Sequence, residues 1–132
     1  MITPVRANHD PKSTPLLYII EKDGKSIFYS NDTGDYGEET MEFLKKRKRP
    51  FSLVSLDCTL GCGYDSYYGH LSLDRCAAIK DTFLKLHIAD ENTIFVINHF
   101  SHNGKNILHD ELCANAKKYG FFASYDGMEV GI

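Results

Sequence analysis

The sequence predicts a layered α/β domain in which one mixed β-sheet is covered by helices. Apolar runs of strand length come first and then alternate with amphipathic segments in a β-α-β-α-β order, which is typical of a sheet with helices packed on it. Of the 132 residues, 42% are hydrophobic and 25% are charged, a composition typical of globular proteins. The length fits one domain.

The expected strands are short runs of β-branched, aromatic and other apolar residues, and they cover residues 15–22, 25–30, 51–57 and 92–98. Asp23 and Gly24 separate the first two runs and supply the positive φ values of a tight turn, so these runs are predicted to form a hairpin. A second Asp-Gly pair lies within residues 121–132, so the chain is expected to close with another hairpin.

The first expected helix covers residues 37–49, written GEETMEFLKKRKR. Its glutamates come early and its basic residues come late, as the helix macrodipole favours. We interpret the basic residues Lys45 to Arg49 as a solvated helix terminus rather than as a nucleic-acid patch.

Two further helices are expected later in the chain. Ser72 is a suitable N-cap for a helix over residues 72–87. Gly120 is a suitable stop for a helix over residues 107–120. The glycine- and tyrosine-rich segment 58–70 has no clear period and is predicted to be a loop.

The cysteines and the terminal sequence indicate a reduced, cytoplasmic protein. The first residues show no apolar leader, and no run approaches the roughly 20 apolar residues of a membrane span. Cys58 and Cys62 form a C-x3-C pattern that would suit zinc, but no second pair stands at finger-like spacing. The simpler interpretation is that the cysteines are small buried hydrophobes.

The net charge of −3 provides no overall attraction to nucleic acid or to an anionic membrane. A partner that carries phosphate would therefore be held locally, by a metal ion or by a few side chains.

Histidines and aspartates stand where the strand-like segments end. His9 follows a strand-like segment at the start of the chain, and Asp32 follows residues 25–30. Asp57 ends the run 51–57, and His99 follows the run 92–98. Sites in layered α/β folds are built at strand ends, because rigid elements position the side chains while the loops admit ligand. Histidine and carboxylate together suit zinc, manganese or iron, and one carboxylate can bridge two cations.

These segments resemble the metallo-β-lactamase fold superfamily. The similarity is carried, in order, by VRANHD (5–10), YSNDTG (29–34), SLDCTLG (55–61), GHLSL (69–73) and NHFSHNG (98–104). It covers nearly the whole chain and is closest to the C-terminal half of ribonuclease Z-like and cyclic-phosphodiesterase-like hydrolases. The resemblance therefore implies half of an αββα sandwich, a single partial domain over residues 1–132.

The resemblance also implies roles for five residues. His9, Asp32 and His99 would be metal ligands, with Asp32 as the bridging carboxylate for two divalent ions. Zinc is the first expectation for these ions, with manganese and iron as alternatives. His70 would donate a proton to the leaving group, or would simply pack at a helix start, and Asp57 would orient a histidine. His102 is interpreted as a surface residue or as a residue that contacts the metal ligands without binding the metal.

The implied function is metal-dependent hydrolysis of a phosphodiester, either in RNA or in a small cyclic molecule. Two alternatives stay open: an acyl hydrolase acting on a lactam or thioester, and a metal-free subunit that binds a partner. Tyr64, Tyr67 and Tyr68 would stack on a base or pack against their own sheet. An aspartic protease built on Asp32-Thr33-Gly34 is disfavoured, because it would need a second carboxylate from a dimer.

One departure from the family matters. The pattern H-x-H-x-D-H, which supplies most ligands in the N-terminal half, is absent from the sequence. The chain is therefore expected to be an incomplete, inactive fragment whose open sheet face is covered by an N-terminal half-domain chain or by a second copy. Leu17, Ile19, Phe28 and Val54 are expected to lie on that open face.

Overall fold

The computed structural model describes residues 1–63, 68–101 and 108–132. In chain order the elements are β1 (Ile2–Arg6), β2 (Leu16–Lys22), β3 (Lys25–Ser30), α1 (Glu38–Lys45), β4 (Leu53–Asp57), α2 (Leu73–Lys85), β5 (Ile94–Asn98), α3 (His109–Lys118) and β6 (Phe122–Ala123). None of these helices is long and apolar enough to cross a bilayer.

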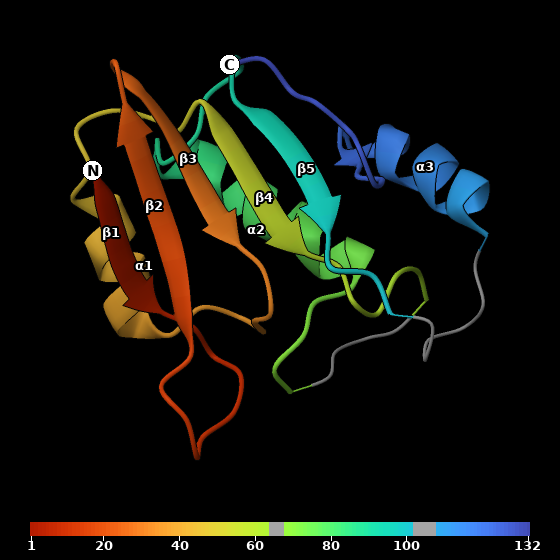
Figure 1. The fold of residues 1–132 in the computed structure, drawn as a ribbon, viewed down its shortest axis with the longest axis horizontal. Helices are drawn as coiled ribbons and strands as arrows, with labels where there is room; N and C mark the ends of the chain where they lie inside the picture. Colours follow the sequence, from red (N-terminus) through yellow and green to blue (C-terminus); the bar gives the residue numbers. More distant parts are fainter. Residues whose placement is uncertain (64–67, 102–107) are drawn as a thin grey trace.

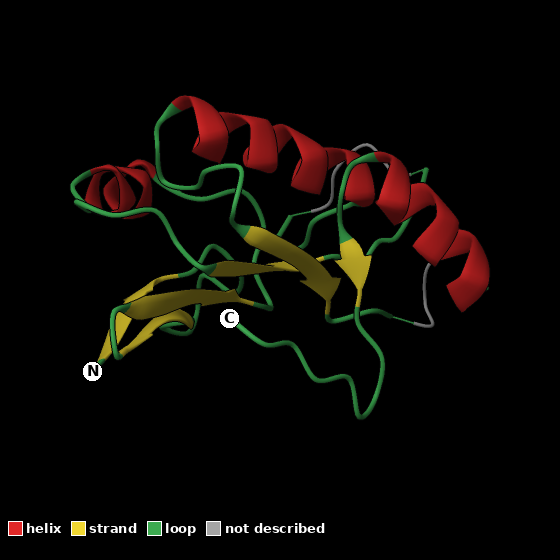
Figure 2. Cartoon of the chain, turned by 90° about the horizontal axis from the view of Figure 1, so that it is seen from above, coloured by secondary structure: helices red, strands yellow, loops and turns green. Residues whose placement is uncertain are grey.

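All six strands belong to one sheet, in the order β1-β2-β3-β4-β5-β6. The first three strands pair antiparallel, and the pairs β3·β4, β4·β5 and β5·β6 are parallel. Figure 1 shows β1, β3, β4 and β5 running in the same direction, so their carboxyl ends meet at one edge of the sheet. Figure 2 shows the helices on one side of the sheet, which confirms the predicted mixed sheet covered by helices.

The first hairpin forms as its turn residues predict. Lys22 pairs with Lys25, and Asp23 and Gly24 adopt positive φ values of 50° and 79°. An Asp-Gly turn of this kind matches the twist of the flanking strands.

The expected helices form with shorter bounds. Ser72 caps α2, because its Oγ accepts a hydrogen bond from the backbone N–H of Arg75 at 3.3 Å. The Arg75 side chain binds Asp35, with Nε and Nη2 lying 3.1 and 2.6 Å from Oδ1. Gly120 follows α3 with a φ of 71°, as expected of a residue that ends a helix.

Aromatic rings dominate the core between the sheet and the helices. Phe28 on β3 stacks on Phe51 with 5.4 Å between ring centroids, and it lies 6.2 Å from Phe83 on α2. Tyr36 packs on Phe83 and places its hydroxyl 2.6 Å from Oγ of Ser30. Burial raises the pKa of Tyr36 far above its ordinary value, so the hydroxyl stays protonated and hydrogen-bonded.

The expected second hairpin is wrong. Phe122 and Ala123 pair in parallel with β5, and the Asp126-Gly127 turn is followed by no strand in the described residues. The two-residue strand offers too few ladder bonds to fix the register of a returning strand. The tail crosses instead to the side of the sheet away from the helices (Figure 2).

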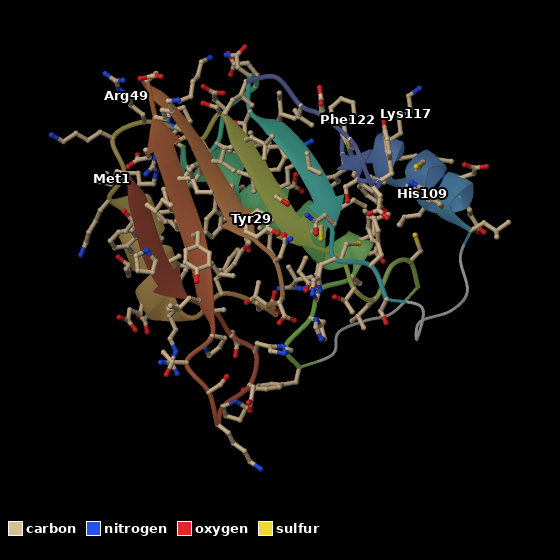
Figure 3. The ribbon with its side chains drawn as sticks, in the orientation of Figure 1. Met1, Tyr29, Arg49, His109, Lys117 and Phe122 are labelled. Carbon is tan, nitrogen blue, oxygen red and sulfur yellow. The ribbon has the colours of Figure 1, made fainter. Side chains whose placement is uncertain are left out.

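The prediction for the open face also named the wrong residues. Leu17, Ile19, Phe28 and Val54 are at most 1% exposed and form part of the core. On β2 the side chains that alternate with them are exposed, and on β3 Tyr29, labelled in Figure 3, is 44% exposed. Because β2 is apolar on both faces, its sequence does not reveal which face the helices cover.

The open face therefore consists of the opposite set of apolar side chains, namely Ile2, Leu16, Tyr18, Ile20 and Tyr29. They are neighbours across the strands, since Ile20 pairs with both Ile2 and Ile27, and Tyr18 pairs with Tyr29. Toward β5 this face continues into a groove of about 860 Å³ between the sheet and the C-terminal tail.

Candidate metal centre

Strand ends position the polar residues that the sequence predicted. Asp57 is the last residue of β4, His99 directly follows β5, and Asp32 follows β3 by two residues. His9 lies in the β1–β2 loop, and His70 lies in the loop before α2. The parallel direction of β1, β3, β4 and β5 brings all five residues to one edge of the sheet (Figure 1).

Three imidazoles surround one carboxylate oxygen. Oδ1 of Asp32 lies 3.5 Å from Nε2 of His9, 3.7 Å from Nε2 of His99 and 3.9 Å from Nδ1 of His70. The His70 ring lies between the other two, with its centroid 4.9 Å from that of His9 and 5.9 Å from that of His99. The structure thus brings together His9, Asp32 and His99, which are remote in the sequence.

The tautomer of His9 follows from its neighbour. Nδ1 of His9 lies 3.0 Å from the carbonyl oxygen of Gly69. A carbonyl only accepts hydrogen bonds, so Nδ1 carries the proton and the neutral ring leaves a lone pair on Nε2. This contact requires glycine: a Cβ on Gly69 would lie 2.8 Å from Nδ1 of His9, and its φ is +85°.

The His99 ring hydrogen-bonds with Thr59 and lies beside Asp57. Its Nδ1 lies 3.2 Å from Oδ2 of Asp57, and the Thr59 hydroxyl lies 2.8 Å from the same nitrogen. A carboxylate partner at Nδ1 favours the tautomer with the proton there, which leaves Nε2 free to bind a cation. Nδ1 of His70 hydrogen-bonds with Oδ2 of Asp57 at 3.1 Å, so the same carboxylate lies beside both rings.

Asp57 is a fully buried carboxylate that satisfies its oxygens with backbone donors. Oδ1 accepts from the N–H groups of Thr59 and Leu71 at 2.9 and 3.0 Å, and Oδ2 accepts from the N–H of Thr33 at 3.3 Å. These donors compensate for the cost of removing the charge from water.

A buried thiol hydrogen-bonds with the backbone of Asp57. Cys76 donates from Sγ to the backbone oxygen of Asp57 at 3.0 Å. The hydrogen bond with Cys58 and burial raise the pKa of the Cys76 thiol well above its ordinary value, so the thiol stays protonated. Cys58 and Cys76 are both 0% exposed and act as core residues.

The donor set fits a divalent cation. His9 and His99 each direct Nε2 toward the same carboxylate oxygen, and in a neutral ring with the proton on Nδ1 this atom carries a lone pair that can bind a cation. Two ligands that each lie about 2.0–2.1 Å from a tetrahedral zinc ion are about 3.4 Å apart, close to the 3.5 and 3.7 Å found here. The site also holds two carboxylates, which favour a cation electrostatically.

A second grouping of ligand atoms overlaps the first. Asp32, Asp57, His70 and His99 each offer one atom, and these atoms all lie within 4.8 Å of one another. It is the only such group of three or more among the described residues, and it contains neither Cys58 nor Cys62. His70 and Asp57, predicted as proton donor and orienting residue, thus also stand at ligand distance.

Thr59, Gly69 and Thr33 contribute to the site without having been predicted. The position of Thr59 two residues after Asp57, where a backbone N–H can reach the aspartate side chain, was the available signal. Thr33 acts through its backbone N–H, which leaves no signature in residue type, and the need for glycine at position 69 follows only from its contact with His9 in the folded chain. Tyr68 is 63% exposed. Tyr64, Tyr67 and His102 lie outside the described residues.

Comparison with family models and with curated proteins finds no match. Solved structures do match. The metallo-β-lactamase fold protein YhfI from Bacillus subtilis superposes with a TM-score of 0.64 at 19% identity, over 96% of this chain and 46% of that one. The chain has part of the metallo-β-lactamase fold.

Two other structures with this fold superpose equally well. An isothiocyanate hydrolase from Delia radicum gut bacteria gives a TM-score of 0.63 at 16% identity, over 96% of this chain and 53% of that one. Unliganded yeast PDE1 gives 0.67 at 15% identity, over 96% and 44%. This chain therefore spans about half the length of these metallo-β-lactamase fold proteins, and its resemblance to the ribonuclease Z-like branch stays a prediction.

Replacing Asp57 with asparagine is expected to destabilise the chain by about 1–3 kcal/mol or more. Both carboxylate oxygens accept N–H donors, so either orientation of the amide places an NH₂ group against a donor. Urea denaturation measures the loss. Asp35→Asn is the control, because this half-exposed residue pairs with Arg75 on the surface, and it is expected to cost less than about 1 kcal/mol. Equal losses would contradict the role assigned to Asp57.

Proposed function

We propose that this chain contributes part of the metal centre of a metal-dependent hydrolase. The observation that carries the proposal is the convergence of the Nε2 atoms of His9 and His99 on Oδ1 of Asp32. In this proposal the three residues are ligands, and Asp32 bridges two divalent ions. Zinc suits these ligands best, and manganese or iron would also fit nitrogen and oxygen donors.

Divalent ions in such a site make water acidic enough to act as a nucleophile near neutral pH and stabilise the negative charge that develops. The residues of this chain hold and orient the ligand atoms. The carbonyl of Gly69 fixes the His9 ring, and Asp57 with Thr59 fixes the His99 ring. Fixed ligand orientation maintains the geometry that catalysis requires.

His70 is the proposed proton donor. Asp57 accepts from its Nδ1, so in the doubly protonated ring the proton on Nε2 is the one available for transfer. In a phosphodiester, attack by water forms a new P–O bond, the P–O bond to the leaving group breaks, and the proton passes to the departing alkoxide. An alkoxide is a poor leaving group, which is why this transfer accelerates the reaction.

The proposed substrate class is a phosphodiester, either in RNA or in a small cyclic molecule. Hydrolysis at carbon is the second candidate, because one of the similar structures is an isothiocyanate hydrolase. An acyl compound such as a thioester is a substrate of this type. Hydrolysis of a thioester differs from hydrolysis of a phosphodiester in one testable respect, since a thiolate departs without a proton.

The site is proposed to be completed by a second half that covers the open face. Three ligands are too few to hold two ions, and the similar structures are about twice as long as this chain. The open face is apolar along β2 and β3, so the occupant that fits it is another β-layer with an apolar face. This layer, carrying an H-x-H-x-D-H segment, would precede residue 1 in the same polypeptide or belong to a separate chain. Four free thiols support a reducing, cytoplasmic location.

The test of the metal centre is binding of Zn²⁺ and Mn²⁺ to the chain by calorimetry. Wild type is expected to bind at least one ion, and Asp32→Ala is expected to lower the affinity by 100-fold or more, because it removes the shared ligand. Asp35→Ala, three residues later in the same loop, is the control and is expected to bind like wild type. A chain that binds no divalent ion, or an Asp32→Ala variant that binds normally, would rule out the metal centre.

The substrate class is tested with His70→Ala in the completed enzyme. Cleavage of a phosphodiester with an alkyl leaving group is expected to fall about 100- to 10,000-fold. Cleavage of bis(4-nitrophenyl) phosphate is expected to change little, because nitrophenolate departs without a proton. Equal losses on both substrates would show that His70 is a ligand or a structural residue. Efficient thioester cleavage without phosphodiester cleavage would favour the acyl hydrolase.

The open face is tested with Ile20→Lys in the isolated chain. Wild type is expected to bind an apolar fluorescent dye or to self-associate, and the variant to do so less, because Ile20 is 37% exposed on the open face. Phe43→Lys on α1 is the control, since Phe43 is 44% exposed on a helix. A monomeric wild-type chain without dye binding would contradict the proposed covering layer.

A further inference from the structure

Two of the proposed ligands occupy a left-handed backbone conformation that is uncommon for residues other than glycine. Asp32 has a φ of 60° and His99 a φ of 61°. A residue with a side chain adopts this left-handed region mainly where its surroundings hold it there. In each case the preceding residue is an asparagine, Asn31 or Asn98.

The two asparagines are hydrogen-bonded to each other across the sheet. Nδ2 of Asn31 donates to Oδ1 of Asn98 at 2.8 Å. The strands that lead to them, β3 and β5, are not neighbours, because β4 lies between them. The contact therefore connects two strand ends that the backbone ladder links only indirectly.

Ser55 on β4 closes this contact into a ring. Its hydroxyl donates to Oδ1 of Asn31 at 3.2 Å and accepts from Nδ2 of Asn98 at 3.3 Å. Each of the three side chains thus donates once and accepts once within the ring. A closed set of hydrogen bonds in a partly buried place is stronger than its separate pairs, because each bond polarises the next.

We propose that Asn31, Ser55 and Asn98 form a positioning network that sets the distance between Asp32 and His99. Each asparagine directly precedes a proposed ligand. A fixed distance between the two asparagines therefore fixes the positions of the Asp32 and His99 backbones relative to each other. Metal sites tolerate errors in ligand distance of only about 0.2 Å. None of the three side chains is a proposed ligand, and none is required by the reaction described above.

Ser55→Ala tests this network without changing a residue next to a ligand. The substitution removes two of the three hydrogen bonds of the ring. The matched control is Ser26→Ala, because Ser26 is 6% exposed against 5% for Ser55 and also accepts a side-chain hydrogen bond, from Arg47. Ser26 lies near the amino end of β3, away from the metal centre, so both variants lose a buried hydroxyl but only one alters the network.

Two measurements distinguish positioning from general stability. In the metal-free chain, nuclear Overhauser contacts between the rings of His70 and His99 are expected to weaken in Ser55→Ala and to persist in Ser26→Ala. With Co²⁺ as the probe, Ser55→Ala is expected to bind about 10-fold or more weakly and to show an altered visible spectrum. Ser55→Thr retains the hydroxyl and is expected to restore both properties.

The inference is overturned if the two alanine variants give the same ring contacts and the same Co²⁺ affinity. Only the Co²⁺ measurement rests on the proposed metal centre. If wild type binds no Co²⁺, the proposed function fails, and the ring contacts of the metal-free chain still decide whether the network positions His99.

Discussion

The carboxylate of Asp57 is fully buried, and the arrangement of the site follows from the need to satisfy it. A charge removed from water must be paired or hydrogen-bonded. The donors come from three separate segments: the loop after β3 through Thr33, the turn after β4 through Thr59, and the segment before α2 through Leu71. The loops that carry Asp32 and His70 are thereby held against the end of β4. His99 joins the same group through its ring nitrogen.

This constraint also determines which nitrogens are free. Nδ1 of His99 hydrogen-bonds with the Thr59 hydroxyl and lies 3.2 Å from the Asp57 carboxylate, and the carbonyl of Gly69 is the partner of Nδ1 in His9. Both rings direct Nε2 toward the exposed side of Asp32. The buried carboxylate of Asp57 thus lies on the Nδ1 side of His99 and His70, whereas the half-exposed carboxylate of Asp32 is the proposed metal ligand. Two carboxylates with opposite exposure have different chemical roles because only one of them is accessible.

The fold leaves one face of the sheet unprotected. The helices bury one side of β2 and β3, and on the other side Tyr18, Ile20 and Tyr29 stay exposed. The metal centre stands at the edge of this sheet, so a layer that covers the open face would reach the site as well. In the proposed function, one covering layer would both complete the set of ligands and bury this apolar surface.

The sequence by itself determined the order of the main elements, the first hairpin, the cap of α2 and the positions of Asp32, Asp57 and His99 after strands, because these depend on local turn chemistry and on where apolar runs end. It did not determine which face of β2 the helices cover, since both faces are apolar. It also predicted a closing hairpin from Asp126-Gly127, although a turn makes a hairpin only where a strand can pair after it. Only the tertiary structure decided how Gly69, Thr59 and the Asn31–Ser55–Asn98 ring support the ligands. These contacts join residues distant in the chain, often through backbone atoms, and such contacts leave no local pattern in a sequence.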